Sequence, residues 1–161
     1  MTKRNKGKGF EAHVQASFER VPNCVVWRLK DQIGRYKNVT NPCDFFFYYK
    51  PTFYAIECKS TKGASLAFSD IREAEQIDDL HTIAQQDGVV AGFLIWFRDK
   101  DVTVFVRHDI VYQAYKNRER QSIALKDILA LSPSDYCILE GVKQRVYYDY
   151  DALSLLSKNF F

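Results

Sequence analysis

The chain has 161 residues, of which 47% are hydrophobic and 15% aromatic, and its net charge is +3. This length and composition indicate one globular domain over residues 1–161 and exclude a disordered chain. The charged N-terminus has no apolar stretch behind it and no segment approaches the length of a membrane span, so we expect a cytoplasmic protein. The cysteines lack zinc-site spacing, and we interpret them as reduced and structural; they are Cys24, Cys43, Cys58 and Cys137.

The predicted elements form an α/β fold in which helices flank a mixed β-sheet. A basic tail over residues 1–8 precedes a helix that runs from about Phe10 and ends before Pro22. Further along the chain we predict strands at 24–29, 44–49, 53–59, 89–97 and 102–107, a helix from an N-cap at Ser69 to about Gln86, and helices at about 109–118, 124–130 and 149–158. Loops are expected at 30–42 and 60–69. Because a long helix separates the strand at 53–59 from the strand at 89–97, we expect these two strands to be parallel neighbours.

Two acidic residues and a lysine lie at the ends of two aromatic strands. Asp44 begins one strand, and Glu57-Cys58-Lys59 end the next. Alternate residues of a strand share a face, so Glu57 and Lys59 point one way and Cys58 the other, and a hairpin can bring Asp44 beside them. Two carboxylates and an amine can then hold Mg²⁺ and a water whose pKa the metal lowers. The alternative is a solvated ion pair on an exposed strand; we favour the site because charged residues at the end of a central strand usually build one.

Basic residues gather in two clusters that flank this site in the sequence. Each cluster alone is compatible with an ordinary solvated surface, but together they suit an anionic substrate such as a phosphodiester backbone. We therefore predict DNA contacts from both clusters, which consist of Lys3, Arg4, Lys6 and Lys8 and of Arg28, Lys30, Arg35 and Lys37. The aromatic run that follows Asp44 is interpreted as core packing of a central strand rather than as a platform for stacking bases.

These motifs resemble the PD-(D/E)XK nuclease superfamily and, within it, the RecU-type Holliday junction resolvases. The half-motifs are NPCD, ending at Asp44, and ECK, from Glu57 to Lys59. The segments NKGKGFEAHV, STKGASLAFSDIREAEQIDDL, GFLIWFRDKDVTVFVRHDIV and RQSIALKDI resemble further parts of the family in the same order, over roughly residues 5–130. The resemblance implies a restriction-endonuclease-like sheet and an endonuclease that depends on Mg²⁺, for which Mn²⁺ substitutes, and that cleaves branched DNA.

The resemblance also implies a role for each residue of the motif. Asp44, Glu57 and the backbone carbonyl of Cys58 would hold the metal ion. Lys59 would orient or deprotonate the attacking water and balance charge near the scissile phosphate.

Two residues on predicted helices are added to the site by resemblance. Glu11 would be a ligand of a second metal ion or of a metal-bound water, and Gln76 would position water or phosphate. For Glu11 the alternative is an ordinary acid on the flank of a helix, and for Gln76 an ordinary exposed glutamine.

The chain departs from the family between its first two strands, where Leu29–Pro42 is short in place of a long stalk. Alternatives therefore stay open: a restriction-like or repair endonuclease acting on duplex or flapped DNA, or a non-catalytic DNA-binding module of the same fold. Two symmetric cuts across a junction need two sites related by a two-fold axis, so we expect a homodimer. The aromatic-rich segment 147–156 and the end at Phe160 and Phe161 either form its interface or cover the core.

Overall fold

The computed structural model describes residues 3–29, 41–71, 74–117, 119–145 and 147–161, and at residues 3–6, 74 and 75 the backbone alone. Three of the basic residues predicted to contact DNA, Lys30, Arg35 and Lys37, lie outside the described residues. No helix within these ranges is long and apolar enough to cross a membrane.

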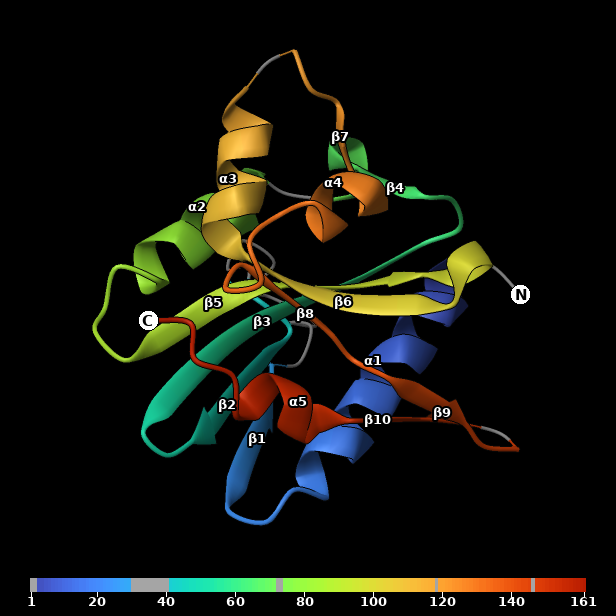
Figure 1. The fold of residues 1–161 in the computed structure, drawn as a ribbon, viewed down its shortest axis with the longest axis vertical. Helices are drawn as coiled ribbons and strands as arrows, with labels where there is room; N and C mark the ends of the chain where they lie inside the picture. The colour runs from blue at the N-terminus through green and yellow to red at the C-terminus, as the bar shows by residue number, and fades with distance from the viewer. Residues whose placement is uncertain (1–2, 30–40, 72–73, 118, 146) are drawn as a thin grey trace, which may run out of the picture.

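A six-stranded mixed sheet forms the centre of the molecule (Figure 1). Its strand order is β1-β2-β3-β5-β6-β8, and every neighbouring pair is antiparallel except β3 and β5. The expectation that these two strands are parallel neighbours is therefore confirmed. The six strands are β1 (Cys24–Arg28), β2 (Phe45–Tyr49), β3 (Thr52–Thr61), β5 (Val89–Phe97), β6 (Val102–Arg107) and β8 (Tyr136–Ile138). Two small sheets pair β4 (Ser65–Ala67) with β7 (Ser122–Ala124) and β9 (Gly141–Lys143) with β10 (Tyr148–Tyr150).

Helices cover both faces of the sheet (Figure 1). One face packs against α1 (Lys3–Glu19) and α5 (Ala152–Leu156). The other face packs against α2 (Ala74–Ile83), α3 (His108–Lys116) and α4 (Leu125–Leu129). The side chains of the central strands β3, β5 and β6 alternate between these two cores, as a period of two requires. Two short 3₁₀ turns, η1 (Phe68–Asp70) and η2 (Arg98–Lys100), complete the chain.

The aromatic run of β2 is explained by this alternation. Phe45 and Phe47 are fully buried beneath α1, and the ring of Phe18 stacks on Phe47 with centroids 4.2 Å apart. Burial of a side chain of this size stabilises the fold by about 1.5–3 kcal/mol. Phe46 and Tyr48 point to the opposite face and are more exposed. Core packing, rather than base stacking, therefore accounts for Phe45 and Phe47.

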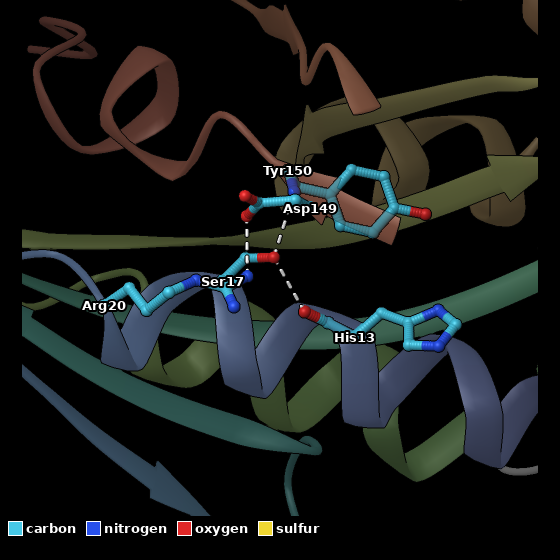
Figure 2. Close-up of polar contacts among 5 residues, drawn as sticks. All are labelled: His13, Ser17, Arg20, Asp149 and Tyr150. Carbon is cyan, nitrogen blue, oxygen red and sulfur yellow. Dashed lines mark hydrogen bonds and ion pairs between the residues drawn. The ribbon is translucent and has the colours of Figure 1, made fainter. Parts of the chain in front are cut away.

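A polar network fastens α1 to β10, far away in the sequence (Figure 2). The buried hydroxyl of Ser17 donates to the carbonyl of His13 at 2.8 Å and accepts the backbone N–H of Tyr150 at 3.0 Å. Beside it, Arg20 and Asp149 form an ion pair at 2.6 Å. These contacts fix how α1 lies across the sheet, and hence where the side chains of its first half reach.

Four predicted elements differ from the structure. The loop expected at 60–69 contains the end of β3, the strand β4 and part of η1. The first helix begins at Lys3 rather than at about Phe10, because its first turns have no apolar residues for a periodicity to reveal. Ser69 does not cap α2: it lies in η1, and Ile71 after it is extended because Phe68 and Ile71 are buried in the second core. Within 149–158 the chain first forms β10, and α5 follows an N-cap at Asp151, whose side chain accepts the backbone N–H of Ser154.

Candidate active site

The site forms just before β2 begins, beside the strand β3, which continues past this point. The last backbone pairing between them is the N–H of Asp44 donating to the carbonyl of Ile56 at 3.2 Å. Beyond this point the N–H of Cys58 has no strand partner, and the Asp44 carboxylate accepts it at 2.7 Å. A buried backbone N–H is costly when unpaired, so the Asp44 carboxylate replaces the missing strand partner of Cys58 as well as contributing charge. The carbonyl of Cys58 points to the same side as its N–H, toward Asp44.

Glu57 and Lys59 share the opposite face of β3 from Cys58, as the alternation of the strand predicts. Their side chains form an ion pair at 2.6 Å and are only 2% and 16% exposed. The second carboxylate oxygen of Glu57, Oε2, is buried and has no hydrogen-bond partner in the described part of the chain. An anionic oxygen left in this state destabilises the fold unless a cation or a donor reaches it.

The two carboxylates disturb each other's ionisation. Burial and then the charge of Glu57 raise the pKa of Asp44 to about 7, although the N–H of Cys58 and the charges of Lys59 and Arg28 oppose this. Burial also raises the pKa of Glu57, against the pull of Lys59. Burial works against the charge on Lys59, but Glu57 and Asp44 outweigh it and raise its pKa, so the ammonium keeps its proton. Close carboxylates in a site of low polarity behave in this way when no cation stands between them.

Glu11 on α1 is close enough to act on the charge of this site, and its carboxylate has a partner there; its predicted role as a metal ligand stays a prediction. Arg28 at the end of β1 forms an ion pair with Glu11 and lowers the pKa of Asp44. The charge of Glu11 in turn raises the pKa of Glu57. The sequence predicts Arg28 as a DNA contact in the second basic cluster, and only its place at the end of the strand that leads toward Asp44 indicates its position beside the site.

Gln76 forms no hydrogen bond with Glu57 or Lys59 in the described part of the chain. It lies on α2, which covers the face that carries these two residues. Its Oε1 is buried without a hydrogen-bond partner among the described residues. Its predicted role in positioning water or phosphate stays a prediction.

The first basic cluster lies on the first turns of α1. Lys8 is exposed and precedes Glu11 by three residues, which places the two side chains on one face of the helix. Lys3, Arg4 and Lys6 belong to the same helix, and their side chains are outside the described atoms.

The candidate ligands supply part of the coordination that a hard divalent cation needs. Asp44 and Glu57 offer carboxylate oxygens, one of them unpaired, and Cys58 offers its carbonyl. Burial raises the pKa of the Cys58 thiol well above its usual value, so the side chain remains a neutral core group. Within the described ranges no three Asp, Glu, His or Cys side chains converge as a metal centre. Any ion held here would therefore rest on two carboxylates and a carbonyl and would keep bound water.

Residues 30–148 match the family described as RecU, recombination protein U. The SPbeta prophage-derived uncharacterized protein YotM of Bacillus subtilis (strain 168) is 32% identical over 125 residues, which are 73% of this chain and 63% of that protein. The chain thus spans less than two thirds of that relative's length.

A solved structure shares the fold. The structure of Hjc from Archaeoglobus fulgidus, a Holliday junction resolvase from an archaeal hyperthermophile, matches with a TM-score of 0.55 over 77% of this chain and 93% of that chain, at 19% identity. This confirms the expected architecture of a mixed sheet flanked by helices. The family match covers most of the chain, including β2 to β9, and agrees with the resemblance of its motifs: the chain belongs to the RecU family.

Proposed function

We propose that this protein is a Mg²⁺-dependent endonuclease that cleaves branched DNA in the manner of a Holliday junction resolvase. The observation that carries the proposal is the buried, unpaired oxygen of Glu57 beside Asp44 and Lys59, at the end of a central strand. A non-catalytic binding module has no need of buried carboxylates that repel each other. Membership of the RecU family and the fold shared with a Holliday junction resolvase support the DNA substrate.

Each residue of the site has a defined task in this proposal. Asp44, Glu57 and the carbonyl of Cys58 would hold the ion, which supplies positive charge that lowers the pKa of a water and offsets charge on the phosphate. Lys59 donates from its ammonium, steadying Glu57 and then the phosphate oxygens. Gln76, with an unpaired buried oxygen, would orient the water or the phosphate.

The N-terminal turns of α1 would bring the DNA backbone to this site. Lys8 lies three residues before Glu11 and is exposed, so a phosphate it contacts lies close to the carboxylates. Resolution of a junction also needs a second site, so we propose that the protein acts as a homodimer. Light scattering of the free protein tests the dimer.

The test is cleavage of three labelled DNAs by the intact chain: a four-way junction, a flap and a linear duplex of the same sequence. We expect cuts in the junction in Mg²⁺ and none in chelator. Asp44→Asn should bind the junction without cutting it, which separates the site from a contaminating nuclease. Equal cutting of linear duplex would show a less selective nuclease, and no cutting of any DNA in Mg²⁺ or Mn²⁺ would refute the proposal.

A further inference from the structure

We propose that Trp27, with Val25 and Tyr48 beside it, forms a stacking strip that receives an open base face of branched DNA next to the active site. The inference rests on the proposed function, because it concerns how DNA lies at the same site. It assigns the choice between branched and linear DNA to a surface that carries none of the candidate metal ligands.

The register of β1 and β2 defines the stacking strip at the edge of the sheet (Figure 1). Val25 pairs with Tyr48, and two residues further along β1, Trp27 pairs with Phe46. Paired residues share a face, and Val26 between them packs into the core beneath α1, so the strip lies on the other face. The helices α2 and α3 of that face pack on β5, and α3 also on β6. They leave the side chains of the strip, in chain order, 42%, 52% and 39% exposed.

The strip lies on the same face as the candidate site and close to it. Phe46 pairs with Ala55 on β3, and Glu57 follows Ala55 by two residues. Trp27 is therefore two strands across and two residues along from Glu57, which corresponds to about 12 Å between their Cα atoms. Successive nucleotides rise about 3.4 Å along one strand of a duplex. A DNA that runs across β1 with a phosphate at Glu57 thus brings a base about three or four steps away to Trp27.

The chemistry of the strip suits a base face rather than a phosphate. The indole of Trp27 offers a broad apolar face, on which any base can stack. A base inside a linear duplex is covered by its neighbours, whereas a branch point interrupts the stack between arms. Lysines for the adjoining phosphates stand at both ends of the strip: Lys59 at the site and the exposed Lys50 in the turn after β2. A ring in this position therefore favours branched DNA over linear duplex.

A second copy of the chain is the other occupant that an apolar strip could receive. A stable interface buries about 800 Å² on each partner, from roughly 20–30 residues. The strip consists of three exposed side chains, which is too little for such an interface. A copy seated on it would also stand in the path of DNA toward Glu57. Both points favour DNA as the occupant, with the proposed homodimer formed through another surface.

The experiment measures binding of the intact chain to labelled DNA by fluorescence anisotropy, in chelator so that the DNA is not cut. The DNAs are a four-way junction and a linear duplex with the same arm sequences. Trp27→Ala should weaken binding to the junction at least about fivefold, the smallest effect of losing one stacked base, and binding to the duplex less than about twofold. Trp27→Phe keeps a ring and should restore most of the lost affinity.

A base analogue reports the stacking directly. 2-Aminopurine at the branch point should lose emission when the wild type binds and keep it when Trp27→Ala binds. The matched control is Phe161→Ala, because Phe161 is 72% exposed and lines a hollow at the start of β5, at the end of the sheet away from Glu57. This control should leave both affinities and the emission change as they are in the wild type.

The outcomes separate this inference from the proposed function. Equal weakening on both DNAs, an unchanged junction affinity or an unchanged emission would overturn the stacking role and leave the nuclease proposal standing. A lower molar mass of Trp27→Ala in light scattering would identify the strip as an interface between copies and would overturn it as well. A wild type that neither binds nor cuts the junction would refute the proposed function itself. If Trp27→Ala does not fold, Tyr48→Ala is measured with the same expected and refuting results.

Discussion

Replacing Asp44 by Asn should stabilise the metal-free protein at pH 8, although it removes a residue of the proposed site. Burial and then the charge of Glu57 raise the pKa of Asp44 to about 7 from an ordinary value of 3.8. At pH 8 the carboxylate is ionised in the folded and in the unfolded chain, but only in the folded chain is this charge buried and placed near Glu57. Asn keeps an oxygen that accepts the N–H of Cys58, so the edge of the sheet remains paired.

The magnitude follows from linkage between ionisation and folding. A pKa difference of one corresponds to about 1.4 kcal/mol, so the raised pKa of Asp44 destabilises the ionised folded state by at most about 4 kcal/mol. Part of this cost remains in the variant, because the new amide must still be buried and Glu57 stays in place. We therefore expect Asp44→Asn to increase the free energy of unfolding by about 1–3 kcal/mol. For a domain of this size each kcal/mol raises Tm by about 2–4 °C.

The sign of the pH dependence is fixed by the direction of the pKa shift. A carboxyl whose folded pKa is raised contributes stability that is fully present below its unfolded pKa and is lost as pH rises through the folded pKa. The Tm difference between Asp44→Asn and the wild type should therefore be small at pH 4 and grow up to pH 8. Mg²⁺ should raise the Tm of the wild type at pH 8 and leave the variant nearly unchanged.

The assay is thermal unfolding in chelator, followed by circular dichroism at pH 4, 6 and 8, and then repeated with Mg²⁺. Asp149→Asn is the matched control, because Asp149 is 43% exposed in a surface ion pair with Arg20. Such pairs contribute at most about 1 kcal/mol, so the control should show a small loss with no growing gain toward pH 8. An Asp44→Asn protein that melts at or below the wild type at pH 8 in chelator would refute the argument.

Three further predictions follow from the structure. Glu57→Gln should lose Mn²⁺ binding in calorimetry and slow cleavage at least about 10²-fold, while gel-shift affinity for a junction is kept; cleavage near the wild-type rate would exclude Glu57 from the site. Lys8→Gln should reduce the steepness of log K against log salt by about one, the effect of losing one phosphate contact, as measured by fluorescence anisotropy. An unchanged slope would mean that Lys8 does not contact DNA. Phe47→Ala should cost about 3–5 kcal/mol in urea unfolding, since the ring is fully buried against Phe18, and a loss below about 1 kcal/mol would contradict the packing.

The parts of the fold that could be predicted are those with a strong local pattern. The apolar run 89–97 forms β5 with the bounds expected, because a strand covered on both faces leaves a continuous hydrophobic signal. The short strands β8 and β10 were not predicted. Each has three residues, too few for an alternation to show, and each exists because of a partner strand: β6 for β8, and β9 for β10. Their partners, rather than their own sequences, decide their structure.

The same distinction applies to the candidate site. Asp44, Glu57 and Lys59 could be placed together because they stand at the ends of neighbouring strands, and local alternation fixes their directions. The ion pair between Arg28 and Glu11 could not be predicted from the sequence, because it depends on how α1 crosses the sheet. That crossing is set by contacts such as Ser17 with Tyr150, which lie 133 positions apart in the chain.

The break in pairing between β2 and β3 links the fold to the chemistry. If β2 began before Asp44, the N–H and the carbonyl of Cys58 would both pair with β2. The Asp44 carboxylate would then have no free N–H there to accept. Because β2 begins one residue later, the carboxylate replaces a strand partner, and the carbonyl of Cys58 is left to point at the site. The same break lets groups from both faces of the sheet meet: Glu57 and Lys59 from one face, Arg28 with Glu11 from the other. A site built this way is unstable without a cation, which is why its metal affinity and its melting temperature should change together.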